Sequence, residues 1–256
     1  MPAANAAIAV RAMGLPELLR SVSLALGLVL VSQSAYAEDL LPLDAGAREA
    51  YQAVGRVNTA GFSVSRGCSG TLIAPDLVVT AAHCVGELQG ATPRYHYVAG
   101  WYRGRFAAHR RSNSVVAHPL YETVHGTKRF SFDVAVVHLE DPIPEGLVAP
   151  IPLVPPQYEM GERAALFGYA NGRPHALSGA LACPTLFADT SRYLFGCEVR
   201  SGTSGGAVIV DFEGTPSLAA VIVARSGPDG NALAVPVSRW LWDIWRDAMK
   251  RAKARL

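Results

Sequence analysis

The sequence predicts an all-β protein made of two halves and closed by a C-terminal helix. Three observations support this fold class: short apolar runs separated by turn residues, a cluster of prolines between two groups of such runs, and helical spacing of apolar residues near the end. The 24 glycines and 17 prolines among 256 residues also argue against long helices before the C-terminus.

The first 37 residues carry the pattern of an export signal. Arg11 and Arg20 precede an apolar run over 21–31, and Ala35-Tyr36-Ala37 supplies the small residues of a cleavage site. A helix over that run would be roughly 16 Å long, too short for the roughly 30 Å core of a bilayer. We predict a signal peptide over 1–37 and export to the periplasm or the extracellular medium, with no membrane contact after cleavage.

Charge and cysteine content narrow the classes of function. The formal net charge of +2 favours neither a nucleic-acid nor a membrane partner. The four cysteines form no CxxC pair and have no histidines at zinc-finger spacing, so we expect no metal and no cofactor. Of the three possible connectivities we expect the local one, with disulfides Cys68–Cys84 and Cys183–Cys197. We expect a monomer.

The elements follow in order along the chain. After an N-terminal extension or short propeptide over 38–50, the first half (51–141) has strand-like runs at 53–57, 70–73, 77–80, 95–98, 114–116 and 134–137. Ala74-Pro75-Asp76 predicts a hairpin turn. Strands of this length and spacing indicate a sandwich or a small barrel.

The prolines gather between the halves. Six of the 17 lie in 142–156, which cannot supply a regular ladder of amide donors, so we expect a linker there. The second half (157–237) has strand-like runs at 164–169, 207–210, 219–223 and 232–235. Over 238–256, Ser238 is a candidate N-cap, and the spacing predicts an amphipathic helix that docks on the second half.

His83 is the candidate general base. It follows an apolar run at a sharp turn, next to Cys84, and an imidazole with an ordinary pKa of about 6.5 can take the proton of a serine hydroxyl and return it. A surface or core role is the alternative for any histidine. We assign that role to the other six, which are His96, His109, His118, His125, His138 and His175.

Ser204 is the candidate nucleophile, within Gly202-Thr203-Ser204-Gly205-Gly206. This segment also matches GxSxG, but an α/β-hydrolase needs its histidine after the serine, and none follows His175. The glycines would let the amides of Gly202 and Ser204 point at one developing oxyanion. A flexible Ser/Gly loop is the alternative interpretation of the motif alone.

Asp133 is the candidate partner of the histidine, because an imidazole needs an acceptor that holds its tautomer. It stands at the head of the run 132–137, where an unpaired charge would be costly to bury, and a strand cap is the alternative. Asp76, Glu140 and Asp141 are interpreted as solvated charges.

With His83, Asp133 and Ser204 in that order, the chain resembles the chymotrypsin-like (trypsin-like) serine endopeptidases. Segments 68–73, 79–84, 117–121, 133–137 and 202–206 are similar to the family's motifs. The resemblance implies two six-stranded antiparallel β-barrels, at 51–141 and 157–237, packed face to face with the triad between them. It also implies protein or peptide substrates and an acyl-enzyme intermediate. A catalytically silent binding protein and an esterase on the same fold are the alternatives.

Thr203 departs from trypsin, which has at this position an aspartate that pairs with a newly released N-terminal amine. We expect that activation switch to be absent and the disulfide Cys183–Cys197 to hold the oxyanion loop instead. The short interval between Asp133 and Ser204, and the cysteine seven residues before Ser204, look more like the bacterial secreted glutamyl-endopeptidase branch.

The residues of the specificity pocket are the least determined. Glu198 lies six residues before Ser204, where trypsin has its pocket acid; it would favour Lys or Arg if equivalent, and is otherwise a solvent-exposed charge. Arg225, Ser226 and Gly227 are expected in the far wall and in an edge strand that pairs with substrate. Arg225 would instead select an acidic residue, and the sequence leaves both alternatives open.

Overall fold

The structure is a computed structural model that describes residues 38–63, 67–86 and 94–255, all within one compact unit, Ala35–Leu256. The predicted signal peptide therefore lies outside the described residues. Within these ranges, no helix combines the length and the apolar character that crossing a membrane requires.

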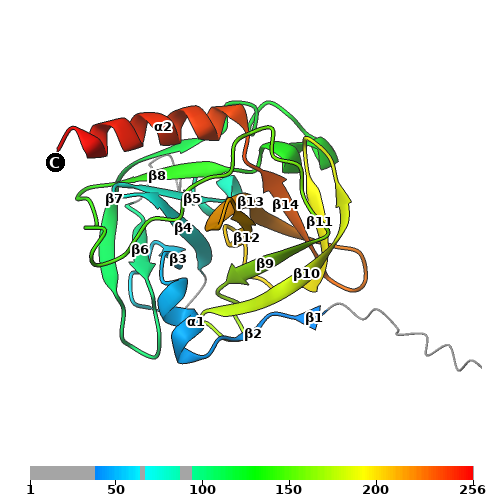
Figure 1. Ribbon diagram of the computed structural model, residues 1–256, viewed down its shortest axis with the longest axis horizontal. Coiled ribbons are helices and arrows are strands. Elements are labelled where there is room, and N and C mark those ends of the chain that lie inside the picture. Colours follow the sequence, from blue (N-terminus) through cyan, green and yellow to red (C-terminus); the bar gives the residue numbers. More distant parts are fainter. Residues whose placement is uncertain (1–37, 64–66, 87–93, 256) are drawn as a thin grey trace, which may run out of the picture. The chain divides into compact units, whose positions relative to one another are not determined.

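Six antiparallel strands close the first barrel (Figure 1). They are β3 (Val54–Asn58), β4 (Cys68–Ala74), β5 (Leu77–Thr80), β6 (His96–Ala99), β7 (Ala108–Ala117) and β8 (Ala135–Leu139). Their order is β3-β4-β5-β8-β7-β6, and β6 pairs back with β3. The predicted turn at Pro75 and Asp76 joins β4 to β5. Branched side chains such as Val54, Val78 and Val136 are fully buried in this barrel, as strand propensity favours.

The second barrel also has six antiparallel strands. They are β9 (Arg163–Gly168), β10 (Ser178–Ala188), β11 (Tyr193–Glu198), β12 (Ala207–Phe212), β13 (Thr215–Ser226) and β14 (Asn231–Pro236). Pairing of β10 with β11 closes the sheet. Two short strands extend it: β1 (Glu38–Asp39) runs parallel to β11, and β2 (Leu41–Pro42) pairs with β10. Helix α1 (Ala45–Ala50) follows, capped by Asp44. The predicted fold class, two barrels and a C-terminal helix, is confirmed.

Strands β10 and β11 lie outside the apolar runs picked out in the sequence. In β11, Tyr193, Phe195 and Cys197 are buried and alternate with partly exposed residues, so the strand has no continuous apolar run. In β10, Leu181 and Phe187 face outward and are exposed. These two strands were implied only by the family resemblance.

The proline-rich stretch 142–156 forms no strand but is held at both ends. The amide of Ile143 donates to Pro75 O at 2.7 Å, and that of Ile151 to Leu72 O at 2.9 Å, both in the first barrel. The amide of Val154 donates to Leu218 O at 3.0 Å in the second barrel. The stretch therefore runs from one barrel to the other as an anchored segment.

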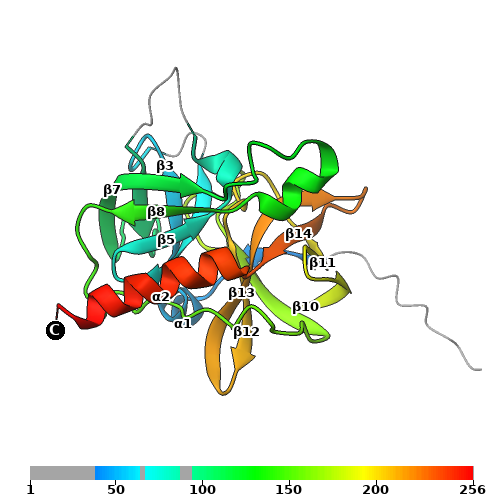
Figure 2. The ribbon, with the colours of Figure 1, turned by 90° about the horizontal axis from the view of Figure 1, so that it is seen from above.

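Helix α2 (Arg239–Lys253) begins beside β14 and crosses to the first barrel (Figure 2). Ser238 Oγ caps it by accepting from the amide of Leu241 at 3.3 Å. The Trp245 indole donates to Ile73 O in β4 at 2.7 Å, and Arg255 pairs with Asp76 at 3.2 Å. The expectation that the helix docks on the second half is therefore wrong, and so is the interpretation of Asp76 as a solvated charge, because its side chain is 14% exposed and ion-paired.

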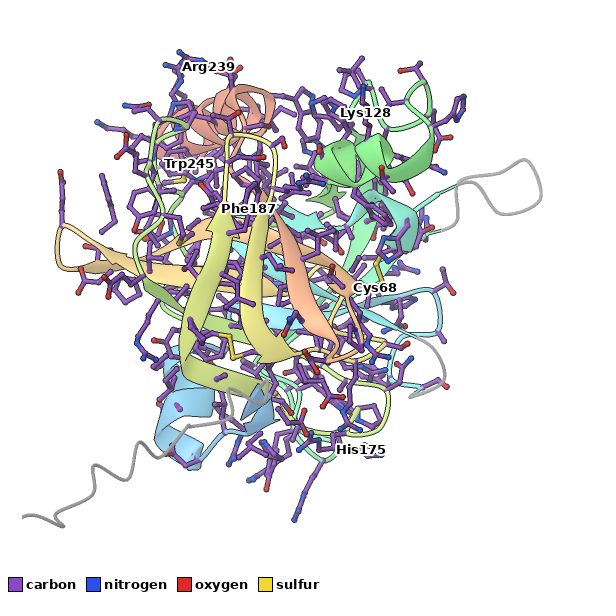
Figure 3. The ribbon with its side chains drawn as sticks, turned by 90° about the vertical axis from the view of Figure 1, so that its right-hand side faces the viewer. Cys68, Lys128, His175, Phe187, Arg239 and Trp245 are labelled. Carbon is purple, nitrogen blue, oxygen red and sulfur yellow. A yellow bond between two sulfur atoms is a disulfide. The ribbon has the colours of Figure 1, made fainter. Side chains whose placement is uncertain are left out.

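Two disulfides are present, with the local pairing expected from the sequence. Cys68–Cys84 joins β4 to the 3-10 turn η1 (Ala82–Cys84), and Cys183–Cys197 joins β10 to β11. Figure 3 shows the first beside its label and the second within the second barrel. The first disulfide ties the turn that carries His83 to a barrel strand.

Candidate active site

His83 is the middle residue of η1, directly after β5. Its side chain is 39% exposed, although the neighbouring Ala82 is buried. A ligating atom of His83 and the sulfurs of Cys68 and Cys84 lie within 4.8 Å of one another. These sulfurs are bonded to each other and are not thiolates, so the cluster is not a zinc ligand set. The disulfide instead packs beside the imidazole and holds its backbone.

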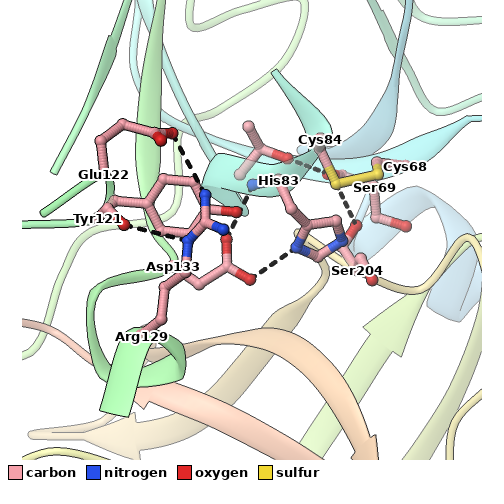
Figure 4. Close-up of polar contacts among 10 residues, drawn as sticks. Cys68, Ser69, His83, Cys84, Tyr121, Glu122, Arg129, Asp133 and Ser204 are labelled. Carbon is pink, nitrogen blue, oxygen red and sulfur yellow. Dashed lines mark hydrogen bonds and ion pairs between the residues drawn. A yellow bond between two sulfur atoms is a disulfide. The ribbon is translucent and has the colours of Figure 1, made fainter. Parts of the chain in front are cut away.

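Asp133 is the buried partner of His83. It follows the 3-10 helix η2 (Gly126–Phe132) as its C-cap, two residues before β8 begins, and so lies at the entrance of the strand, as the sequence indicated. Its side chain is 4% exposed. Its Oδ1 accepts from the His83 amide at 2.8 Å, and its Oδ2 lies 2.6 Å from His83 Nδ1 (Figure 4). These bonds to His83 argue against a role as a strand cap.

Ser204 lies in the turn between β11 and β12. Its carbonyl oxygen accepts from the Ser69 amide at 2.7 Å and lies 3.9 Å from Cys84 Sγ. The turn of the second barrel is therefore bonded to the strand and disulfide that hold His83, and Figure 4 shows Ser204 beside the imidazole. Among the described residues, no hydrogen bond joins the hydroxyl to the ring. Such a bond often tightens only when substrate binds.

Glycine is required around Ser204 by the backbone. Gly202 has a φ of +97° and Gly205 a φ of +81°. A Cβ at Gly205 would lie 2.0 Å from Ser69 O, and one at Gly202 would lie 2.6 Å from Tyr169 O. Side chains at these positions would strain the backbone and clash with main-chain atoms, so the glycines shape this turn.

The amides of this turn fall into two groups. The amide of Thr203 donates to Arg200 O at 3.0 Å, and that of Gly205 to Ile222 O at 2.7 Å. By contrast, the amides of Gly202 and Ser204 have no acceptor within the described part of the chain. Two donors therefore remain for a ligand on the turn that carries the candidate nucleophile.

Ser69 is a residue of the candidate site that the sequence did not single out. It is fully buried, and its Oγ donates to Gly202 O at 2.9 Å while accepting from the Tyr169 amide at 2.8 Å. One hydroxyl of the first barrel thus bonds to both the turn that carries Ser204 and the residue that follows β9 in the second barrel. Ser69 lies in the segment similar to the family's histidine motif, but sequence spacing cannot reveal partners 100 and 133 positions away.

Thr203 and the N-terminal strand hold the same turn. Thr203 is 2% exposed, and its Oγ1 donates to Arg200 O at 2.6 Å. Asp39 in β1 contacts Arg173 at 2.5 Å and Arg200 at 3.5 Å. The segment before Ser204 is therefore held by several contacts in addition to the disulfide Cys183–Cys197, including the carboxylate of Asp39 in β1.

The expected specificity residues lie close together. A Cβ at Gly230 would lie 3.0 Å from Glu198 Cγ and 2.9 Å from Arg225 Nη2, so both side chains converge on this glycine. The Glu198 side chain is 30% exposed and pairs with Arg200 at 3.3 Å, so it is not a free solvated charge. Ser226 ends β13, and Gly227, with a φ of +71°, begins the turn to β14.

A cavity of about 680 Å³ adjoins His83 and is lined in part by Tyr121, Glu122 and Arg129. Arg129 donates to Tyr121 O at 3.1 Å, lies 3.9 Å from the centroid of its ring and contacts Glu122 at 3.3 Å. Burial raises the pKa of Tyr121. The sequence singled out neither Glu122 nor Arg129, because their link to His83 depends on the fold of the loop after β7.

Comparison with known proteins gives the family. A model of the trypsin-like peptidase domain matches residues 68–216. A solved structure of a Glu endopeptidase in complex with MPD has a similar fold, with a TM-score of 0.67 and 18% identity over 86% of this chain and 99% of that chain. No curated protein matches the chain significantly in sequence. Since the family match covers more than half of the sequence, the chain belongs to the family of trypsin-like serine endopeptidases.

Proposed function

We propose that the protein is an exported endopeptidase in which Ser204, His83 and Asp133 act as a catalytic triad. The observation that carries this proposal is the pair of hydrogen bonds between His83 and the buried Asp133, at 2.6 and 2.8 Å. An imidazole whose Nδ1–H donates a hydrogen bond to a carboxylate keeps that proton and presents Nε2 as the base for a serine hydroxyl. Asp133 also stabilises the imidazolium that forms when the proton moves.

The reaction then proceeds in two halves. Ser204 Oγ attacks the scissile carbonyl while His83 takes its proton, and the tetrahedral intermediate places its oxyanion on the amides of Gly202 and Ser204. Each such donor typically contributes roughly 10²- to 10³-fold in rate. His83 returns the proton to the leaving amine, and a water molecule activated by His83 hydrolyses the acyl-enzyme by the same steps in reverse.

The charges around Gly230 support a preference for an acidic residue at the cleaved position. Glu198 is compensated by Arg200, and Asp39 by Arg173, whereas Arg225 has no carboxylate partner among the described residues. The uncompensated charge is therefore positive. Cleavage profiles of a peptide library should favour Glu or Asp before the scissile bond, and Arg225→Ala should reduce that preference about tenfold or more. An unchanged profile would remove Arg225 from the pocket.

The experiment that tests the endopeptidase proposal is hydrolysis of an unstructured protein by the wild type and by three variants. Ser204→Ala and His83→Ala should each lose at least about 10⁴-fold in rate. Ser201→Ala is the matched control, because this exposed serine lies in the same turn, and it should keep most of the activity. A folded wild type that cleaves small esters but no peptide bond would instead indicate an esterase.

A further inference from the structure

A second cavity, of about 920 Å³, lies away from His83. Its walls come from four separate segments: Pro42 to Arg48, Phe62 with Ser63, Trp101 to Gly104 in the loop between β6 and β7, and Arg173 to Ala176 in the loop between β9 and β10. In Figure 3, His175 lies at the end of the molecule opposite Arg239. No aspartate or glutamate is among the described residues that line this cavity.

The cations of this cavity are only partly compensated. The Arg48 guanidinium lies 3.9 Å from the centroid of the Tyr102 ring, and that of Arg103 lies 5.3 Å from the same centroid. Neither has a carboxylate partner within the described ranges, whereas Arg173 is paired with Asp39. Two positive charges therefore flank one aromatic ring, an arrangement that favours an anionic ligand.

Hydrogen-bond donors point to the same ligand chemistry. Trp101 is 6% exposed, and its indole N–H has no acceptor among the described residues. Behind it, Arg56 is 1% exposed, its Cζ lies 5.5 Å from the Trp101 ring centroid, and its Nη1 has no partner in the same part of the chain. A buried donor without an acceptor is costly. Indole and guanidinium groups only donate, so the missing partner is an acceptor such as a carboxylate.

The cavity is linked to the oxyanion turn by main-chain contacts. The Arg103 amide donates to His175 O at 2.9 Å, and the Asn171 amide, in the same loop as His175, donates to Ser201 O at 2.7 Å. Tyr169 donates its hydroxyl proton to Trp101 O at 3.1 Å, while its amide bonds to Ser69. The loop between β9 and β10 therefore contacts both the segment that lines the cavity and the turn that carries Ser204.

We propose that this cavity is a second substrate-binding site that takes an acidic segment of the polypeptide being cleaved, outside the residues at the scissile bond. A carboxylate pairs with Arg103 beside Tyr102, and an acceptor on the segment accepts a hydrogen bond from the Trp101 indole N–H. The inference rests on the proposed endopeptidase function. Tethering the substrate at a second point raises its effective concentration at the triad and lowers KM.

Direct binding tests the site without turnover. The Ser204→Ala protein is titrated with a fluorescein-labelled peptide of sequence Gly-Glu-Tyr-Glu-Glu-Phe-Glu, and with the same peptide in which every Glu is Gln. We expect the acidic peptide to bind more tightly, and Arg103→Glu to weaken it about tenfold or more. Arg105→Glu is the matched control, because Arg105 is exposed in the same loop but does not line the cavity, and it should have little effect.

A second variant separates the hydrogen bond from the charge. Trp101→Phe keeps an aromatic ring and removes the indole donor, and it should weaken peptide binding several-fold, about the effect of one hydrogen bond to a charged group. Circular dichroism and thermal denaturation check that each variant is folded. Arg225→Ala should leave the effects of Arg103→Glu and Trp101→Phe in place, since Arg225 does not line this cavity.

Kinetics then connect the site to cleavage. For an unstructured substrate with an acidic flank, Arg103→Glu should raise KM and leave kcat unchanged, and it should have no effect when the flank is neutral. Equal effects of Arg103→Glu and Arg105→Glu, or tighter binding of a sulfated polysaccharide than of the peptide, would overturn the proposal. Binding of the peptide at Arg103 by a protein that cleaves nothing would overturn the endopeptidase function and leave the cavity as an acidic-peptide site.

Discussion

In the proposed triad, Asp133 is the residue that orients the base. Both of its oxygens bond to His83, one to the backbone amide and one to Nδ1, and its side chain is almost completely buried. Because the carboxylate selects the tautomer that leaves Nε2 free, Asp133→Asn should lower kcat by about 10⁴-fold with little change in KM. Steady-state kinetics on a peptide substrate would measure this. Retention of activity within about tenfold of wild type would remove Asp133 from the triad.

Ser69 holds the turn that carries the proposed oxyanion donors through its hydroxyl. Ser69→Ala leaves the carbonyl of Gly202 and the amide of Tyr169 without a buried partner, so the variant should lose about 1–3 kcal/mol of folding free energy. A small shift of the turn should also lower kcat on the order of 10- to 100-fold.

The control for Ser69→Ala is Ser217→Ala. Ser217 is 2% exposed and donates only to Thr215 O at 3.0 Å, in a strand of the second barrel away from the site. Denaturant unfolding and kinetics on both variants separate stability from positioning. If the two variants lost kcat equally, Ser69 would have no specific positioning role.

Helix α2 follows the last strand of the second barrel and is hydrogen-bonded to the first barrel. Its Trp245 indole donates to Ile73 O, whereas the ring of the neighbouring Trp242 packs on the Trp245 ring at 4.8 Å and its indole N–H makes no hydrogen bond among the described residues. Trp245→Phe should therefore cost about 1 kcal/mol of unfolding free energy, and Trp242→Phe clearly less, with kcat unchanged in both. Equal losses in thermal denaturation would contradict this docking contact.

Among the secondary-structure elements, the sequence patterns predicted the strands that bury a continuous apolar run. Strands such as β5 and β12 were found this way, whereas β11 alternates and β10 exposes Leu181 and Phe187. The position of α2 was wrongly predicted because an amphipathic face shows that a helix docks but not on what. The 3-10 helix η2, which ends directly before Asp133, has no pattern in the sequence that predicts it.

The candidate site shows the same division between local and long-range information. His83, Asp133 and Ser204 were recognised from residue type, local turns and chain order, and the turn around Ser204 from its glycines. The contacts that position these residues were not recognised from the sequence. Ser69 is hydrogen-bonded to residues 100 and 133 positions away, and Arg173 is paired with Asp39, 134 positions before it. Such pairs depend on how the two barrels come together.

The whole molecule should become less stable as the pH falls. Burial lowers the pKa of His96, His109, His118 and His138, and nearby arginines lower that of His109 further. An unfolded chain takes up these protons near about pH 6.5, whereas the folded protein does so only at lower pH. The unfolded state therefore binds more protons as the pH drops through this range, and the free energy of unfolding decreases.

Thermal denaturation from about pH 7.5 to about pH 5 measures this effect as a falling Tm. His109→Gln should flatten the profile, because it removes one of the two rings that stack with nitrogens 2.8 Å apart in the His96–His109 pair. A Tm that stays constant or rises on acidification would contradict the assignment of these histidines as neutral in the folded state.

The most direct measurement of the central claim is covalent labelling of the folded protein with an active-site phosphonate, followed by peptide mapping. The account predicts one adduct on Ser204, none in Ser204→Ala, and greatly slowed labelling in Asp133→Asn because the base is misoriented. Folded wild-type protein that forms no adduct, or forms it on another serine such as Ser201, would contradict the proposed triad.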